Sequence, residues 1–342
     1  MKKCNVIGLD LAKNVIQVCK ISSDGELIYN KAVSPNKLRS LLVKEKSSIV
    51  ALEGCGSCHY WGRLAQQYGH DVRIISPKKV KAFLQGQKTD ANDALAIAVA
   101  SIQVGMIFSQ LKSEEQQIIQ TVEKTRKFLD KSLTALSNHI RAFMYEYGIT
   151  SPIGKKGLRE TVTLVLSDDD DRLPANLQGI LTLLWERYKV TLEHLTANEK
   201  IREALVNSIE PCRRLLDLES VGPVGAARLY AAIGNGKTFK KGRDASVYIG
   251  VTPKQHSSGG NVYMRGINKG GGDKELRAVL YQGAFSVIYK LPPQARTKKQ
   301  AWLMNLVTRV GVKRAAIALA NKTVRTAWAL LVSGEKYRAE LV

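Results

Sequence analysis

The sequence predicts an α/β domain at the N-terminus, a helical middle and a mainly helical C-terminal domain. Three short apolar runs come first, and helical and strand-like segments alternate after them to about residue 104. From residue 111 onward, apolar residues recur at helical spacing. A chain of 342 residues has room for two or three domains with a sizeable core. We expect the domains to cover residues 1–110, 111–209 and 210–342.

The first domain has the element order of an RNase H-like fold. Strands are expected over 4–10, 14–21 and 25–33, with Asp24-Gly25 as a turn between the last two. The segments after them predict, in order, a helix from Pro35, a strand (48–53), a helix (57–68), a strand (71–75), a helix from Pro77 and a helix over about 90–104. By analogy with that fold, the first and fourth strands should lie side by side.

Four carboxylates stand at positions that suit a metal-dependent nuclease. Asp10 ends the first strand and Glu53 ends the fourth, so the expected pairing would bring them together. Asp90 and Asp93 share one face at the start of a helix, because residues three apart are neighbours on a helix surface. Several hard oxygen ligands that converge on one point can hold Mg²⁺ and activate a phosphodiester. This constellation indicates phosphoryl transfer on nucleic acid.

The middle segment predicts two long helices. Val122, Leu129, Leu136 and Phe143 repeat every seven residues, and a second apolar stripe runs over 177–195. We interpret the segment as a coiled-coil spacer or assembly element. The acidic run over 167–171 is better explained as solvated charge near a helix N-terminus than as a metal site.

The C-terminal domain contains two motifs that suit contact with nucleic acid. The first, Val221-Gly222-Pro223-Val224-Gly225, predicts a helix–hairpin–helix in which Gly222 and Gly225 let backbone N–H groups approach a phosphate. A plain tight turn between helices is the alternative. The second is the glycine-rich basic stretch over 252–272, followed by an amphipathic helix. It could be a flexible linker, but its cations favour phosphate contact: Lys254, Arg265, Lys269, Lys274 and Arg277.

The charge balance favours a polyanionic partner. The chain has 52 Lys+Arg against 30 Asp+Glu, a net charge of +22. From Lys237 to Val342 there are 20 Lys+Arg and 5 Asp+Glu, a surplus of +15, so the C-terminal third should contribute most to binding. A basic surface that serves only solubility is the alternative.

Other features narrow the class of protein. No signal peptide is evident and no apolar run reaches the roughly 18 residues of a membrane span, so we expect a cytoplasmic location and no membrane partner. Five cysteines, an odd number, suggest reduced thiols. The segment Cys55-Gly56-Ser57-Cys58-His59 matches haem, redox and partial zinc patterns, but the context of each is missing. We expect a sharp strand-to-helix turn there, with His59 and Tyr60 in the active site or the core.

Taken together, the motifs resemble the DEDD transposases of bacterial insertion sequences, a family that includes Piv-type DNA invertases. The matching segments are Gly8-Leu9-Asp10-Leu11-Ala12-Lys13, Glu53-Gly54-Cys55-Gly56, Lys88-Thr89-Asp90-Ala91-Asn92-Asp93-Ala94, Val221-Gly222-Pro223-Val224-Gly225, and Thr252-Pro253 followed by Ser257-Ser258-Gly259-Gly260.

The resemblance implies a RuvC-like N-terminal domain, a coiled-coil middle and a C-terminal transposase domain. It implies Mg²⁺ held by Asp10, Glu53, Asp90 and Asp93, and a serine nucleophile at Ser258, with Ser257 as the neighbouring alternative. It also implies a structured guide RNA that pairs with donor and target DNA, and a homo-oligomer, either dimer or tetramer.

The sequence therefore predicts an RNA-guided, Mg²⁺-dependent DNA recombinase that works through a phosphoserine intermediate. Because Ser258 and the carboxylates lie in different predicted domains, these domains must meet, within one chain or between subunits. A RuvC-like structure-specific endonuclease that uses water as nucleophile is the first alternative. A non-catalytic nucleic-acid-binding protein with a decayed nuclease fold is the second.

Overall fold

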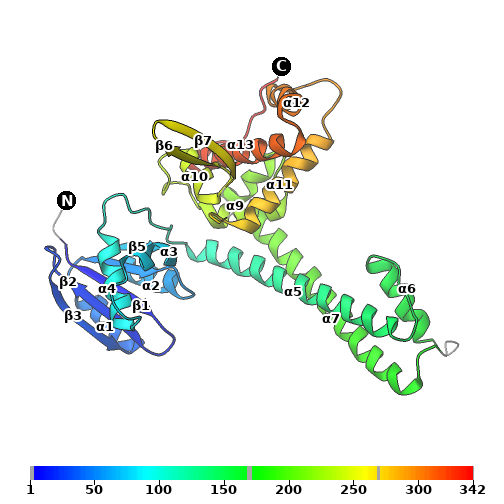
Figure 1. Cartoon of the computed structure of the whole chain (residues 1–342), viewed down its shortest axis with the longest axis horizontal. Coiled ribbons are helices and arrows are strands. Elements are labelled where there is room, and N and C mark those ends of the chain that lie inside the picture. Colours follow the sequence, from blue (N-terminus) through cyan, green and yellow to red (C-terminus); the bar gives the residue numbers. More distant parts are fainter. Residues whose placement is uncertain (1–3, 168–171, 268–269, 342) are drawn as a thin grey trace. The chain divides into compact units, whose positions relative to one another are not determined.

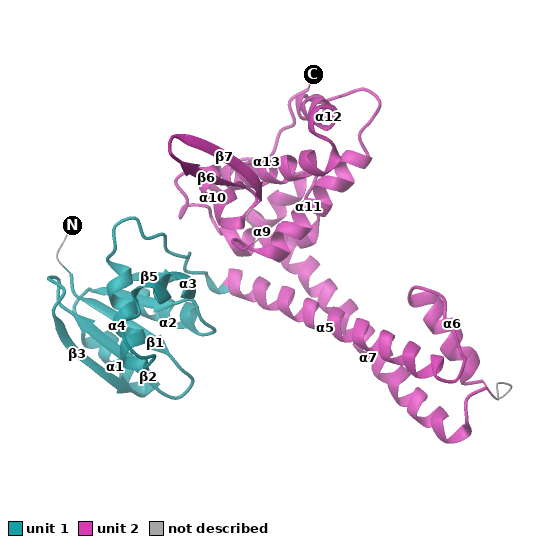
Figure 2. Cartoon of the chain, in the orientation of Figure 1, with its two compact units in different colours: residues 1–114 teal, residues 115–342 magenta. Residues whose placement is uncertain are grey.

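The chain folds into two compact units, residues 1–114 and 115–342 (Figure 2). The computed structural model describes residues 4–167, 172–267 and 270–341. The boundary between the units lies at the start of the long helix α5 (Glu114–Tyr145). The further division at residue 209 stays a prediction from the sequence.

A five-stranded sheet forms the centre of the first unit (Figure 1). Its order is β3-β2-β1-β4-β5, in which β1, β2 and β3 are antiparallel and β4 and β5 run parallel to β1. The predicted neighbourhood of the first and fourth strands is confirmed. The strands are β1 (Val6–Leu11), β2 (Ile16–Ile21), β3 (Leu27–Val33), β4 (Ile49–Glu53) and β5 (Asp71–Ile75).

Strand alternation gives the sheet two buried faces. Ile7, Leu9, Val50 and Leu52 belong to one core cluster together with residues of α1 (Pro35–Lys44) and α2 (Cys58–Gln67). On the opposite face, Val6 of β1 and Ala51 of β4 pack with residues of α4 (Asp90–Ser101). Between β5 and α4 lie the short α3 (Pro77–Val80) and a 3-10 turn (Lys81–Phe83). Since successive side chains of a strand point to opposite faces, Asp10 and Glu53 share the face covered by α4.

Helix α4 lies close against β1 because small residues meet at the contact. A Cβ on Gly8 would lie 2.8 Å from the Cβ of Ala98 and still closer to the carbonyl oxygen of Ala94. Thr89 caps the helix: its side chain accepts a hydrogen bond from the backbone N–H of Asn92 at 3.3 Å. This close packing fixes the start of α4 over the end of β1.

The second unit begins with a pair of long helices. Helices α5 and α7 (Ala175–Ser208) lie side by side (Figure 1). Helix α6 (Lys155–Val165) packs on them near the C-terminal end of α5 and the start of α7. Leu133 and Ile140 of α5 share a cluster with Leu181 and Tyr188 of α7. The two predicted long helices are confirmed, while supercoiling remains a prediction. The aspartates at 168–171 lie outside the described residues.

The rest of the second unit is helical with one hairpin. A single core cluster joins its helices, which surround the buried α9 (Pro223–Ile233). The stretch expected as a glycine-rich loop contains an antiparallel hairpin instead, formed by β6 (Pro253–Ser258) and β7 (Asn261–Ile267). The other elements are α8 (Glu210–Arg214), a 3-10 turn (Leu215–Asp217), α10 (Gly242–Ile249), α11 (Lys274–Tyr289), α12 (Lys298–Val310) and α13 (Val312–Ser333).

None of the described helices combines the length and apolar character needed to cross a lipid bilayer.

Gly8→Ala should loosen α4 from the sheet. The added Cβ meets backbone atoms of α4, and overpacking of this kind costs about 1–3 kcal/mol of unfolding free energy. Hydrogen exchange of the full chain should therefore speed up in β1 and α4 and stay unchanged in the second unit. Gly56→Ala is the matched control, since its Cβ would meet nothing within 4 Å. Equal exchange in both variants would contradict the close packing.

Candidate functional site

Two of the four predicted carboxylates lie near the ends of neighbouring parallel strands, Asp10 as the penultimate residue of β1 and Glu53 as the last residue of β4. Leu9 of β1 is opposite Leu52 of β4, and Asp10 and Glu53 are the next residue of each strand. Both side chains are half-buried on the face that α4 covers. Asp90 is the first residue of α4 and Asp93 lies in its first turn.

The carboxyl groups of Asp10 and Glu53 interact electrostatically with other predicted acidic residues. Burial raises the pKa of the Asp10 carboxyl, the negative charges of Asp93 and Asp90 raise it further, and Lys88 opposes the shift. Burial also raises the pKa of Glu53, with further contributions from Asp10 and Asp93. Mutual repulsion of this kind requires the groups to be close and imperfectly solvated. Asp10 thus lies within electrostatic range of Asp90 and Asp93, and Glu53 within range of Asp10 and Asp93.

The donor set suits a hard divalent cation, since all four groups offer carboxylate oxygens. In the described part of the chain, no group of three or more His, Cys, Asp or Glu side chains is arranged so that it could hold a metal ion as it stands. The carboxylates therefore interact electrostatically, but their oxygen atoms do not converge on one metal-binding position.

A purely structural role explains only half of this cluster. Asp90 and Asp93 in the first turn of α4 interact favourably with the helix macrodipole, and helices commonly carry acidic residues there. That account does not cover Asp10 and Glu53, which are strand residues whose carboxyl pKa values are raised. Half-buried carboxylates that repel one another cost stability, which favours a functional reason for their presence.

The segment after Glu53 is the predicted strand-to-helix turn. Helix α2 begins at Cys58, and that residue is buried while Cys55 is exposed. A hydrogen bond from the Cys58 thiol is the largest of several effects that lower the pKa of Cys55 to about 6. His59 accepts a hydrogen bond from the backbone N–H of Lys112 at 3.3 Å. The exposed Tyr60 ring lies beside Arg39, so both side chains have partners within the first unit.

Ser258 stands at the end of β6, next to the tip of the hairpin. It is exposed and lies opposite Asn261, and Gly259 and Gly260 connect the strands with φ of +55° and +80°. A two-residue turn with both φ values positive matches the twist of a hairpin and favours glycine. The Gly-Gly pair between two strand-length runs was the signal in the sequence for this hairpin.

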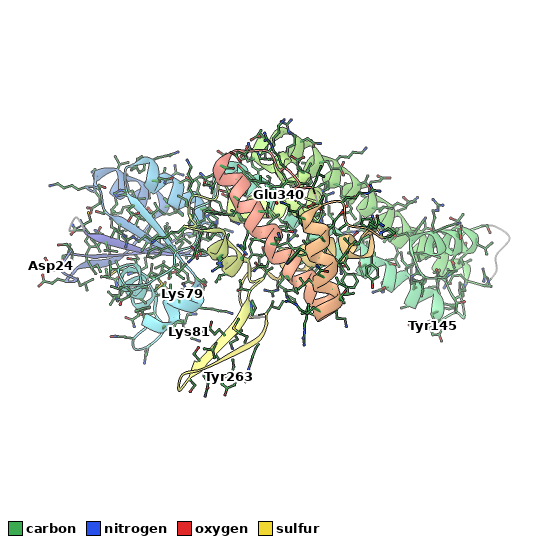
Figure 3. The ribbon with its side chains drawn as sticks, turned by 90° about the horizontal axis from the view of Figure 1, so that it is seen from above. Asp24, Lys79, Lys81, Tyr145, Tyr263 and Glu340 are labelled. Carbon is green, nitrogen blue, oxygen red and sulfur yellow. The ribbon has the colours of Figure 1, made fainter. Side chains whose placement is uncertain are left out.

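The hairpin separates the two serines onto opposite faces. Ser257 lies on the face of Gln255, whose side-chain amide donates a hydrogen bond to the Ser257 hydroxyl at 3.0 Å. The register places Ser258 on the other face, which carries Lys254, His256, Asn261, Tyr263 and Arg265. Figure 3 shows the hairpin standing out from the helices of the second unit, with Tyr263 on it. The Ser258 face is therefore polar and basic, whereas Val262 and Met264 lie on the Ser257 face.

The glycines of the predicted helix–hairpin–helix differ in their surroundings. Gly222 caps α9, is exposed, and has open space where a Cβ would be. Gly225 is buried, and its Cβ would lie 3.3 Å from Val221 and 3.8 Å from Val279. Gly222 is thus accessible to a phosphate, whereas Gly225 allows close packing. Phosphate binding by this turn stays a prediction.

The predicted basic residues differ in their exposure to solvent. Lys254 and Arg265 are opposite each other on the hairpin and exposed, and Lys274 is exposed at the start of α11. Arg277 is buried, and its guanidinium donates to the carbonyl oxygens of Gly250 and Gly271. That geometry argues against direct contact between Arg277 and nucleic acid. Lys269 lies outside the described residues.

Comparison with known proteins gives the family. The model described as the Transposase IS116/IS110/IS902 family matches residues 212–300, and the IS110-type DEDD transposase model matches residues 7–149. A transposase for insertion sequence element IS1111A from Coxiella burnetii is 36% identical over 338 residues, which cover 99% of this chain and 92% of that protein. The chain belongs to the IS110 family of transposases.

Two further relatives agree with this assignment. A transposase for insertion sequence element IS1328 from Yersinia enterocolitica is 32% identical over 98% of both chains. A pilin gene-inverting protein from Moraxella bovis is 22% identical over 86% of this chain and 89% of that protein. In this family member, the match over 7–149 includes the four carboxylates, and the match over 212–300 includes the hairpin with Ser258.

Asp10→Asn should stabilise the metal-free transposase at neutral pH. Because the pKa of Asp10 is raised in the folded state, ionising this carboxyl costs stability, and the cost appears as pH rises through the folded pKa. The neutral amide removes that cost. Thermal unfolding in excess chelator should give a higher midpoint for the variant at neutral pH and equal midpoints in acid. A lower midpoint at neutral pH would show that the carboxylate is instead stabilised by its surroundings.

Proposed function

We propose that this transposase cuts and rejoins DNA through a phosphoserine intermediate formed by Ser258, with Mg²⁺ held by Asp10, Glu53, Asp90 and Asp93. The observation that carries the proposal is that Asp10 of β1 and Glu53 of β4 have raised pKa values, to which the negative charges of Asp90 and Asp93 in the first turn of α4 contribute. A fold without a cation partner would have little reason to keep such a cluster.

The carboxylates would act as the metal-binding half of the site. Their side chains have one or two rotatable bonds beyond Cβ, so small rotations could turn their oxygens toward a common point. A cation between them would relieve the repulsion that raises the pKa values of Asp10 and Glu53. When bound, Mg²⁺ would stabilise the charge that develops on a phosphodiester during transfer.

Ser258 would form the covalent intermediate. Its Oγ attacks phosphorus and forms a serine–phosphate ester, while the bond to one deoxyribose oxygen breaks and that oxygen leaves with a proton. Attack by a DNA hydroxyl on this ester reverses the exchange, so strands can be rejoined without ATP. Lys254 and Arg265 on the same hairpin face suit contact with the neighbouring phosphates. His256, two residues before Ser258 on this face, is chemically suited to accept the serine proton.

The two halves of this chemistry belong to separate compact units. Catalysis would therefore require the units to meet on the DNA, either within one chain or between subunits of a homo-oligomer. The long helices α5 and α7 are the elements available to set that arrangement or to join subunits.

Replacing Ser258 tests the covalent step. The full-length protein is incubated with labelled DNA and Mg²⁺, resolved on a denaturing gel, and any attached nucleotide is mapped by mass spectrometry. Ser258→Ala should bind DNA and give no adduct. Ser257→Ala is the matched control and should give most of the wild-type adduct, because Ser257 lies on the opposite face of β6.

The position of the adduct decides between mechanisms. An adduct on Ser257 would move the nucleophile by one residue. Cleavage by the wild type without any adduct would contradict the serine mechanism and favour an endonuclease that activates water.

We further propose that a structured guide RNA encoded by the element directs the protein to its DNA. The support is the family resemblance of the sequence motifs, which implies a guide RNA, together with the net charge of +22. RNA that co-purifies with the protein should contain one dominant structured species transcribed from the element. A random sample of cellular RNA, which a basic protein would also retain, would contradict guidance.

A further inference from the structure

A large groove opens on the second unit beside the hairpin. Its volume is about 1490 Å³, and its walls come from the start of α10, the base of the hairpin, Trp302 of α12 and one side of α13. Pockets that enclose small molecules are typically about 300–1,000 Å³ and largely apolar. This groove is larger, and all of its charged lining residues are basic, beside apolar side chains such as Ile317 and Trp328.

Cations line the groove without any acidic partner. Seven Lys and Arg side chains contribute to its walls and no Asp or Glu does: Lys241, Arg243, Arg265, Lys313, Arg314, Lys322 and Arg325. Within the described ranges, none of the seven forms an ion pair, whereas Arg228 and Lys299 elsewhere in this unit pair with Glu123 and Glu219. Cations that repel one another across a concave surface create a field that attracts and holds an anion. We name these seven residues and the walls between them the basic groove.

The spacing of the cations suits a polymer. Arg314, Lys322 and Arg325 lie along α13 and extend over 11 residues, which is about 16 Å of helix. That length corresponds to about five base pairs of DNA at 3.4 Å each. Lys322 is held over the ring of Trp302 at 4.5 Å, so part of the charge is positioned before any ligand arrives. A small anion would engage only a fraction of this surface.

The groove is also connected to Ser258 through the hairpin. Pro253 and residues 264–267, at the base of the hairpin, line the groove, and Ser258 stands at the other end of β6. Five residues of strand separate Pro253 from Ser258, which is about 17 Å. A strand of DNA bound in the groove could therefore continue along the Lys254–Arg265 face to the serine.

We propose that the basic groove binds the sugar–phosphate backbone of duplex DNA next to the bond that is cut. This rests on the proposed function, which places the reacting phosphate at Ser258. The groove contributes position rather than sequence specificity, because its cations contact phosphates and carry no base-reading geometry. Sequence choice would then depend on other parts of the complex.

The test measures binding of the full-length protein to a labelled random-sequence DNA duplex in chelator, across a range of salt concentrations. Arg314→Gln/Arg325→Gln removes two exposed cations of the groove. Lys336→Gln/Arg338→Gln removes two exposed cations after α13 and is the matched control. Each lost phosphate contact flattens the log–log salt dependence by about 0.9, so the groove variant should lose about two units and the control close to none.

Several outcomes would overturn the proposal. One is a salt slope unchanged by the groove variant, and another is an equal loss in the control, which would indicate a general charge effect. The same binding measurement is repeated with a folded RNA in place of the DNA duplex. If the groove variant loses RNA affinity and keeps DNA affinity, the groove belongs to RNA and the assignment to DNA is wrong. Thermal unfolding of each variant confirms that the exposed substitutions leave the fold intact.

This test is independent of the covalent step. Ser258→Ala should keep the wild-type salt slope, because binding is measured without metal or cleavage. If no adduct is found but the groove variant shows a flattened salt slope, the groove proposal is supported and the phosphoserine mechanism is not. Conversely, an unchanged salt slope in the groove variant would contradict the groove proposal and would not affect the phosphoserine mechanism.

Discussion

The parallel pairing of β1 with β4 is the constraint on which the rest of the site depends. Without it, residues 43 positions apart in the chain, Asp10 and Glu53, would have no reason to meet. The pairing places them near the carboxyl ends of two neighbouring strands. Strand alternation turns both side chains toward α4. Gly8 completes the arrangement, since a side chain there would hold α4 away from β1 and carry Asp90 and Asp93 with it.

Ionised carboxylates at this site destabilise the metal-free fold. Hydrophobic packing on both faces of the sheet holds Asp10 and Glu53 near the first turn of α4, although burial and the charges of neighbouring carboxylates raise the pKa values of both residues. The second unit carries the opposite charge, since seven cations line a groove and form no ion pair among the described residues. One unit therefore suits a divalent cation and the other suits a polyanion. Nucleic acid with a bound metal ion satisfies both requirements.

The sequence predicted the first unit well because its signals are local. Apolar runs of strand length, the Asp24-Gly25 turn and the Thr89 cap each follow from neighbouring residues, and all five strands are found near their expected positions. The second unit was harder. Glycine and polar residues hid the hairpin at 253–267, although Gly259-Gly260 marked its turn. Burial of Arg277 and the basic groove depend on tertiary packing of α10, α11 and α13, which no local pattern reveals. The overall charge asymmetry indicated a basic surface without locating it.

Direct observation of a metal ion is the most direct test of the proposed site formed by Asp10, Glu53, Asp90 and Asp93. Crystals of the transposase grown with Mn²⁺ in place of Mg²⁺ would locate the ion through its anomalous scattering. We predict a peak coordinated by carboxylate oxygens of Asp10 and Glu53 together with Asp90 or Asp93, and loss of that peak in Asp10→Asn. A peak coordinated elsewhere, or none at these carboxylates in a preparation that cuts DNA, would contradict it.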